Sequence, residues 1–391
     1  MERKRLNPWY IFIALLILPS PIFHAYGISY QMRAMIVLVF DFFLLIKNRF
    51  QIPLHFLRYL SLLLIMGVIT AIGNKGIEFI FLLYCLIFYS LLINLSTEDD
   101  ISKFVDIASI FLIILEIGAY IAFVYFILGG KSLWSFPNPD GRQNDLWLTT
   151  FTNAWVSFYI RPAGIYDEPG SFAFFIICIC ILRIKYKKNP KITLFILLLG
   201  YITTSLAYII CSFFVYLELR KKFSYKYKQI LCLLLVLLIF ALLSCCYNVL
   251  NTMIFSRFII DPTTHIMKGD NRSSQITNAI QYIKDYGFLF GYHHHIDNSI
   301  ITSKYGIITE NIFTPITKYG FFNSLPFTLL YLFGIFLLPS DSRYIVISIL
   351  LLFMQRPYYE ALGYTGFFSI FFNMFYKSFI KKYSHLFILR R

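Results

Sequence analysis

The sequence predicts an all-α, polytopic membrane protein that forms a single integral membrane domain over residues 1–391. The first observation is composition: 58% of the residues are hydrophobic and only 14% are charged, whereas soluble domains are about one quarter charged. The second is a mean hydropathy of +0.68. The third is that long apolar runs recur along the chain, and about 20 such residues cross a bilayer as a helix.

These runs predict about twelve transmembrane helices. The first follows a basic N-terminus, as in a signal peptide, but no small-residue cleavage site comes after it, so we expect it to be retained. The first six spans are expected at residues 9–26, 32–46, 54–72, 77–95, 104–128 and 172–182. The last four are expected at residues 230–250, 319–338, 344–354 and 364–379.

Between these two sets, the apolar run 192–217 is flanked by two basic clusters, residues 183–191 and 220–228. A single helix would carry the clusters to opposite sides of the membrane, although Lys and Arg favour the cytoplasmic side. We therefore expect two short helices that break near residues 200–205 and return the chain to the same side.

The net charge of +15 is interpreted as a signal of membrane topology, and no nucleic-acid partner is expected. If the chain starts inside, most Lys and Arg fall in the inner loops, which is the distribution that orients membrane proteins. Both termini are then cytoplasmic, and residues 129–170 and 251–318 form outer loops. No strand-rich domain is expected.

The first outer loop contains a polar stretch, Arg161 to Ser171, directly before an apolar run. It combines a guanidinium with the adjacent carboxylates of Asp167 and Glu168, and such groups beside a membrane helix are costly unless they serve a function. The alternative is a capped interfacial loop, in which Asp167, Glu168 and Ser171 open the following helix.

The second outer loop is expected to contain an amphipathic helix from Ser273 to Tyr286, capped by Asp270 or Ser273. Its apolar residues recur at helical spacing: Ile276, Ala279, Ile280 and Ile283. Such a helix lies either on the membrane or on the protein domain.

No metal or nucleotide cofactor is expected. His293, His294 and His295 are consecutive, and their side chains cannot all face one ion without an unusual turn. The sequence has neither a phosphate-binding loop nor a nucleophile turn. The seven cysteines lie in or beside apolar runs and are expected to be core residues.

Three arginines are expected on the outer face: Arg161, Arg272 and Arg356. Arginine binds phosphate oxygens bidentately and keeps its charge, so the three suit a lipid diphosphate whose tail lies in the bilayer. A nearby histidine or glutamate could accept a proton from an attacking hydroxyl. The alternative for each single arginine is a snorkelling or salt-bridged surface residue.

Two acids, Asp41 and Glu116, fall inside predicted spans. Acids inside a membrane are candidates for function, and a proton-coupled transporter would use them. Because these two are isolated, we expect buried, protonated side chains.

The pattern Arg161-x-x-Gly164-x-x-x-Glu168-Pro169 resembles the arginine–glycine–acid–proline signature of O-antigen polymerases, the Wzy family. Later segments resemble the family's polar helix break, the arginine-then-glycine part of its large periplasmic loop, and the start of its next helix. In order, these are Thr203-Thr204-Ser205, Asn271-Arg272-Ser273 with residues 286–292, and Glu310-Asn311 with residues 319–322. The order of these motifs carries the resemblance, and no single histidine aligns.

The resemblance implies a membrane glycosyltransferase of the all-helical GT-C kind at the periplasmic face of the bacterial inner membrane. Such an enzyme joins undecaprenyl-diphosphate-linked oligosaccharide repeat units into the O-antigen of lipopolysaccharide. Inversion at the anomeric carbon is implied, without a metal or nucleotide. The implied partners are the lipid-linked oligosaccharide, membrane lipid and a co-polymerase that regulates chain length.

Under this hypothesis Arg161 and Arg272, supported by Arg356, neutralise the diphosphate as the glycosidic bond breaks. Glu168 is the preferred general base, and His294 is the second choice. The further candidates are Asp167, His293, His295, Glu310 and Asn311.

Two other functions stay open. An O-antigen ligase of the same superfamily would have nearly the same hydropathy and usually carries a histidine in the large loop, which residues 293–295 would supply. A lipid-linked oligosaccharide flippase would suit the spans and the positive interior. A long outer loop with its own helix and the absence of repeated halves argue against a flippase.

Overall fold

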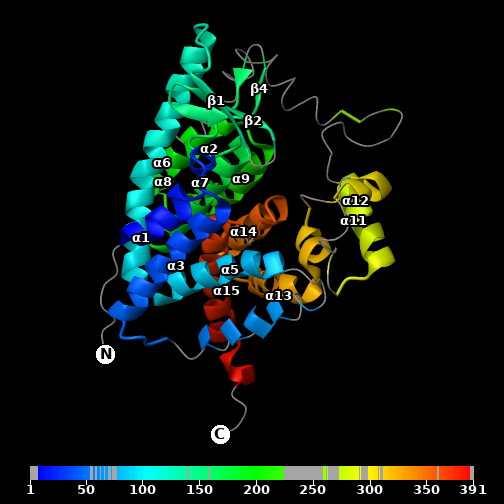
Figure 1. Cartoon of the computed structure of the whole chain (residues 1–391). Coiled ribbons are helices and arrows are strands. Elements are labelled where there is room, and N and C mark those ends of the chain that lie inside the picture. The colour runs from blue at the N-terminus through cyan, green and yellow to red at the C-terminus, as the bar shows by residue number, and fades with distance from the viewer. Residues whose placement is uncertain are drawn as a thin grey trace. The chain divides into compact units, whose positions relative to one another are not determined.

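The chain forms two compact units, and it is mostly helical in this computed structural model (Figure 1). Unit 1 comprises Met1–Phe111, Phe136–Arg142 and Ile276–Arg391, and unit 2 comprises Leu112–Ser135 and Gln143–Gln275. The structure describes residues 8–52, 56–57, 60–61, 63–65, 67–68, 72, 77–138, 141–156, 159–223, 259–260, 262, 273–289, 291, 298–306, 308, 311–358 and 361–387. Of the predicted spans, 54–72 is thus described in part, and 230–250 lies outside the described residues.

Most helices of unit 1 correspond to predicted spans: α5 has the predicted bounds, and α3 contains the predicted span 32–46. The described helices that lie wholly or mostly in unit 1 are α1 (Pro8–Phe12), the π-helical turn η1 (Ile13–Ile17), α2 (Ile22–Ala25), α3 (Tyr30–Lys47), α5 (Ile77–Leu95), α11 (Ser273–Tyr286), α12 (Asn298–Tyr305), α13 (Thr314–Leu337), α14 (Arg343–Gln355) and α15 (Tyr364–Phe387).

The first predicted span is divided rather than straight. Pro19 and Pro21 separate η1 from α2, because proline has no backbone N–H with which to continue a helix. The buried side chain of Arg33 donates from Nη1 to the carbonyl oxygens of Leu18 (3.0 Å) and Ser20 (3.1 Å). The guanidinium thereby satisfies carbonyl groups that lie where the helix stops.

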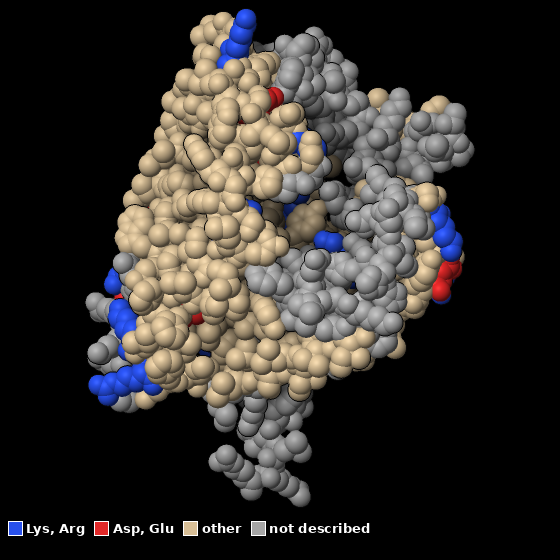
Figure 2. Space-filling model, viewed as in Figure 1, with Lys and Arg blue, Asp and Glu red and all other residues tan. Residues whose placement is uncertain are grey.

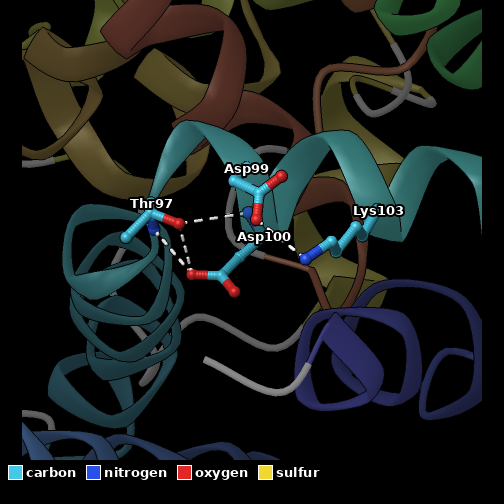
Figure 3. A network of polar contacts seen from close by, with 4 residues as sticks. All are labelled: Thr97, Asp99, Asp100 and Lys103. Carbon is cyan, nitrogen blue, oxygen red and sulfur yellow. Dashed lines mark hydrogen bonds and ion pairs between the residues drawn. The ribbon is translucent and has the colours of Figure 1, made fainter. Parts of the chain in front are cut away.

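Helix α6 (Glu98–Ile127) passes from unit 1 into unit 2 and begins with a capping box (Figure 3). Thr97 N–H donates to Asp100 Oδ2, and Asp100 N–H donates to Thr97 Oγ1, each over 3.1 Å. Asp99 and Lys103 add an ion pair of 2.8 Å one turn apart. These contacts start the helix before residue 104, where the sequence predicted it.

By length and composition, the described chain supports one or two membrane-spanning helices, not the predicted twelve. Among the described residues, α6 is the one helix that is long and apolar enough to cross a membrane alone, and the bent α13 would add a second. The other apolar helices are shorter: Pro8–Ile17, Tyr84–Leu95, Pro190–Thr203 and Arg343–Gln355. Breaks such as those at Pro19 and Gly200 shorten runs that hydropathy alone joins.

Helices α3 and α6 expose apolar stripes. On α6 the stripe is 46% to 63% exposed and consists of Ile110, Ile114, Ile117, Ile121 and Val124. On α3 it consists of Met32, Met35, Val39, Phe42, Phe43 and Ile46. Charged side chains are sparse over much of the described surface in Figure 2. Large exposed apolar surfaces mark contacts with protein or membrane, so both stripes are consistent with membrane association.

Unit 2 is built around α7 (Pro169–Lys185), which is buried along almost its whole length. Helices α8 (Pro190–Leu199) and α9 (Leu206–Arg220), drawn in green in Figure 1, pack against it. The 3-10 turn η2 (Gly200–Thr203) separates α8 from α9. The predicted division of the apolar run 192–217 into two short helices is therefore confirmed.

Residues 134–160 contain short strands, which the sequence analysis did not predict, although they do not make a strand-rich domain. The strands are β1 (Trp134–Pro137), β2 (Gln143–Trp147), β3 (Thr150–Thr152), β4 (Trp155–Val156) and β5 (Tyr159–Ile160). β2 pairs antiparallel with β3, with Leu146 opposite Phe151, and β4 pairs antiparallel with β5. Aromatic and β-branched residues in this loop favour strands, but runs of two to five residues are too short to show a clear alternation.

Helix α11 has the predicted bounds, Ser273–Tyr286. Its residues Ala279 and Tyr282 are buried against Ile301 and Tyr305 of α12 and against Ile308. Of the two predicted positions for this amphipathic helix, the structure favours packing on the protein domain.

Candidate functional site

Residues 161–171, called the signature segment below, are held beside β3. Phe151 N–H donates to Gly164 O (2.7 Å), and Ala163 N–H donates to Phe151 O (2.8 Å). The hydroxyl of Thr152 donates to Arg161 O (2.7 Å). The segment is therefore fixed like an additional strand, although its arginine and carboxylates have no strand-forming pattern in the sequence.

The backbone conformation at the turn of this segment requires a glycine at position 164. Its φ of +64° lies in the left-handed region that glycine adopts readily, and an added Cβ would lie 3.3 Å from the ring of Phe172. The hydroxyl of Thr150 accepts the N–H of Gly164 over 2.8 Å. The glycine of the signature is thus explained by local geometry.

The guanidinium of Arg161 contacts the break between α8 and α9. Its Nε donates to Thr204 Oγ1 (3.1 Å), and its Nη2 reaches Thr204 O (3.5 Å). Thr204 is itself in the left-handed conformation, with φ +46° and ψ 32°. Two motifs that lie 43 residues apart, the signature arginine and the polar helix break, therefore meet in unit 2.

The two carboxylates of the signature segment differ in their hydrogen bonding at the start of α7. Asp167 Oδ1 accepts from the hydroxyl of Ser171 over 2.7 Å, as the alternative of a capped loop expects. Glu168 is the N-cap of α7, but its side chain makes no capping hydrogen bond. Its backbone carbonyl accepts the N–H groups of Ser171 and Phe172 instead. Glu168 is half-buried, as is Arg161.

Two further candidates, Asn311 and Arg356, lie in unit 1. Asn311 is buried, its Nδ2 donates to Ile308 O (2.9 Å), and its Oδ1 accepts from Phe313 N–H (2.8 Å). Its amide therefore orders the turn before α13. Arg356 ends α14, where its N–H donates to Leu352 O over 2.9 Å, and its side chain is half-buried.

The glycine-containing segment of residues 287–291 and the start of α13 also meet. Phe321 N–H donates to Phe288 O (2.8 Å), and the two rings lie 4.8 Å apart. A Cβ on Gly291 would lie only 2.6 Å from the backbone N of Gly320. Gly320 has φ +78° inside α13, a conformation that bends the helix.

The structure therefore places Arg161, Asp167 and Glu168 in unit 2, and Asn311 and Arg356 in unit 1. Five predicted site residues lie outside the described residues: Arg272, His293, His294, His295 and Glu310. Convergence of the three arginines on one diphosphate stays a prediction. Sequence analysis did not identify Thr150 and Thr152 as supports of the signature segment, and the three threonines in residues 149–152 were the available signal.

Metal ligands and cysteines can be assessed over part of the chain. Within the residues that the structure describes, no group of three or more His, Cys, Asp or Glu side chains could hold a metal ion. Four cysteines are described, Cys85, Cys178, Cys180 and Cys211, and all are buried. The prediction that cysteines are core residues is confirmed for these four.

The two predicted intramembrane acids are both buried. Asp41 of α3 and Glu116 of α6 have no exposed surface. Neither carboxylate has a hydrogen-bond partner in the described part of the chain. The expectation of buried side chains is confirmed.

Comparison with known proteins returns no match: no family model, no curated protein and no solved structure is similar to this chain.

Proposed function

We propose that this chain is a membrane glycosyltransferase that joins undecaprenyl-diphosphate-linked oligosaccharide repeat units into O-antigen polysaccharide. The reaction takes place at the periplasmic face of the bacterial inner membrane. The observation that supports this most is the meeting of Arg161 with Thr204 at the break between α8 and α9. The signature segment and the polar break are the first two motifs of the resemblance to O-antigen polymerases, and they are in direct contact.

The proposal includes a polytopic arrangement of about twelve spans, in which the shorter apolar helices cross as broken or paired segments. The exposed apolar stripes of α3 and α6 support contact with lipid. Both termini are cytoplasmic in this arrangement, because the basic residues gather in the inner loops. The outer loops then face the periplasm, as a GT-C architecture requires.

In the proposed reaction the growing chain is the donor and a lipid-linked repeat unit is the acceptor. The acceptor hydroxyl attacks the anomeric carbon of the donor, the bond from that carbon to the diphosphate oxygen breaks, and the configuration inverts. The bonding electron pair leaves with undecaprenyl diphosphate, and the hydroxyl proton passes to a base. The diphosphate is already a good leaving group, so the step needs neither a metal nor a nucleotide.

Arg161 is assigned to the leaving diphosphate, with Arg272 and Arg356 in support. A guanidinium has five N–H donors in a fixed plane. Thr204 binds the guanidinium of Arg161 at Nε and at Nη2. These contacts orient the guanidinium before the substrate binds. Stabilising charge that develops at the leaving group is often the largest contribution to such catalysis.

Glu168 is assigned as the base that accepts the hydroxyl proton, and His294 is the second choice. The Glu168 carboxylate stands one residue from Asp167, which is engaged with Ser171, and it is not used to cap α7. A base within about 3 Å of the attacking hydroxyl typically contributes 10²–10⁴-fold in rate. Glu168→Gln is therefore expected to lose polymer, whereas Asp167→Asn should retain it.

The proposal is tested by a lipopolysaccharide gel from a deletion strain complemented with variants. The deletion should show core plus a single repeat, and the wild-type chain should restore the ladder. Arg161→Ala should fail to restore it, whereas Arg220→Ala, at the exposed end of α9, is the matched control and should succeed. Core with no repeat in the deletion strain would contradict a polymerase and indicate a ligase or a flippase. A ladder restored by Arg161→Ala would remove this residue from the site.

A further inference from the structure

A second site of possible chemistry lies inside unit 2, on the buried face of α6. This face consists of Leu112, Leu115, Glu116, Ala119 and Ala122, which repeat every three or four residues. Four of the five are apolar. The carboxylate of Glu116 therefore points into the same packed interior as its apolar neighbours, with 0% of its surface exposed.

The groups around Glu116 supply no positive charge. It interacts electrostatically with Tyr120 on its own helix, with Cys180 on α7 and with Tyr208 on α9. Tyr159 of β5 adds to the electrostatics of Tyr120. Within the described residues, no lysine or arginine makes a hydrogen bond to the Glu116 carboxylate. The acid is thus enclosed by aromatic and thiol groups.

Tyr208 and Arg183 make hydrogen bonds to groups other than Glu116. The hydroxyl of Tyr208 donates to Leu197 O over 2.6 Å. Arg183, which lies near Cys180 on α7, donates from Nε to Thr193 Oγ1 (3.0 Å) and from Nη2 to Asn189 O (3.3 Å). Neither oxygen of Glu116 has a hydrogen-bond partner in the described part of the chain.

An ionised carboxylate in such a place is unfavourable. Burying an unpaired charge costs several kcal/mol even after relaxation of the protein, so buried acids are either paired with a cation or neutral. No cation pairs with Glu116 in the described part of the chain. We propose that Glu116 is a proton-binding site, at which the side chain is held as a neutral carboxylic acid in the interior of unit 2 at neutral pH.

The proposal does not depend on glycosyl transfer, because neither the observation nor its test involves the signature segment.

The test is the infrared difference spectrum of the purified full chain in lipid nanodiscs at neutral pH. The wild-type spectrum minus the Glu116→Gln spectrum should show the carbonyl band of a neutral carboxylic acid. Glu218→Gln is the matched control in the same unit, because Glu218 pairs with Lys221 over 2.8 Å, and its difference spectrum should show carboxylate bands alone. Carboxylate bands for Glu116→Gln as well would overturn the proposal.

A second measurement covers the case in which Glu116→Gln fails to fold. Wild-type protein is prepared with ¹³C in the side-chain carboxyls of its glutamates. The neutral-acid band should move to lower frequency with this label, and an aspartate label should leave that component in place. A spectrum in which no neutral-acid intensity follows the glutamate label would overturn the proposal without any substitution.

Discussion

Arg161 is fixed through both its backbone and its side chain, so its guanidinium is already oriented when a ligand binds. Thr152 binds its carbonyl oxygen, and Thr204 binds its guanidinium. A side chain that is fixed before binding loses less conformational entropy when it contacts a ligand. Under the proposed function, Thr204 is a positioning residue that acts through Arg161.

This role predicts the effect of substitutions at Thr204. Thr204→Ala removes the hydroxyl that accepts from Arg161 Nε, and hydrogen bonds to charged groups contribute about 1.5–3 kcal/mol. Polymer formation should therefore fall by roughly tenfold or more. Thr204→Ser keeps the hydroxyl and should retain most of the activity. Ladder formation and the amount of membrane protein are measured together, and an unchanged ladder in Thr204→Ala would contradict the role.

At the scale of elements, the cluster between α11 and α12 gives a pH-dependent prediction. Asp285 accepts from the hydroxyl of Tyr305 (2.7 Å) and from Gln281 Nε2 (2.9 Å). The Tyr305 hydrogen bond is the main cause that lowers the pKa of Asp285. Because the folded-state pKa is lowered, the stabilisation by Asp285 is present above the pKa of the unfolded chain. It is lost as the pH falls through the folded-state pKa, which lies below the ordinary value for aspartate.

Tyr305→Phe removes that donor, so the pKa of Asp285 should rise toward the ordinary value for aspartate. The measurement is a titration of the Asp285 carboxyl by ¹³C NMR. Tyr286→Phe is the control, since the Tyr286 ring stacks on Tyr282 in the same cluster. Its titration curve should coincide with that of wild type. A Tyr305→Phe curve that also coincides with wild type would contradict the assigned cause.

Elements with long apolar runs could be predicted well, and the contacts between elements could not. The bounds of α5 and α11 and the break between α8 and α9 follow from hydropathy, helical spacing and the positions of basic clusters. The strands of the first outer loop were missed because each is too short for a periodic signal. The contact of Arg161 with Thr204 could not be predicted, because nothing in the local sequence links residues so far apart.

At the scale of the whole molecule, the account requires that the exposed stripes of α3 and α6 face lipid. A nitroxide spin label at Ile114, which is 61% exposed on α6, should collide more often with oxygen, which partitions into lipid, than with a water-soluble nickel chelate. A label at Lys103, in the first turns of the same helix, should show the opposite preference. Preferential collision with the chelate at Ile114 would contradict membrane insertion of this helix.

The candidate site residues are divided between the two units. Unit 2 carries Arg161 and Glu168, and unit 1 carries Asn311 and Arg356. Sequence analysis grouped these residues because they fall in expected outer segments, and their grouping in one site stays a prediction. The amide of Asn311 orders a turn, so its role is better explained as structural.

The most direct measurement is polymerisation by the purified chain, supplied with undecaprenyl-diphosphate-linked repeat units in the presence of a chelator and without nucleotide. The account predicts products longer than one repeat and release of undecaprenyl diphosphate. Arg161→Ala should abolish both, and Arg220→Ala should preserve both. If the wild-type chain leaves the repeat units unjoined, or if Arg161→Ala polymerises them at the wild-type rate, the proposed reaction or its assignment to the signature segment is contradicted.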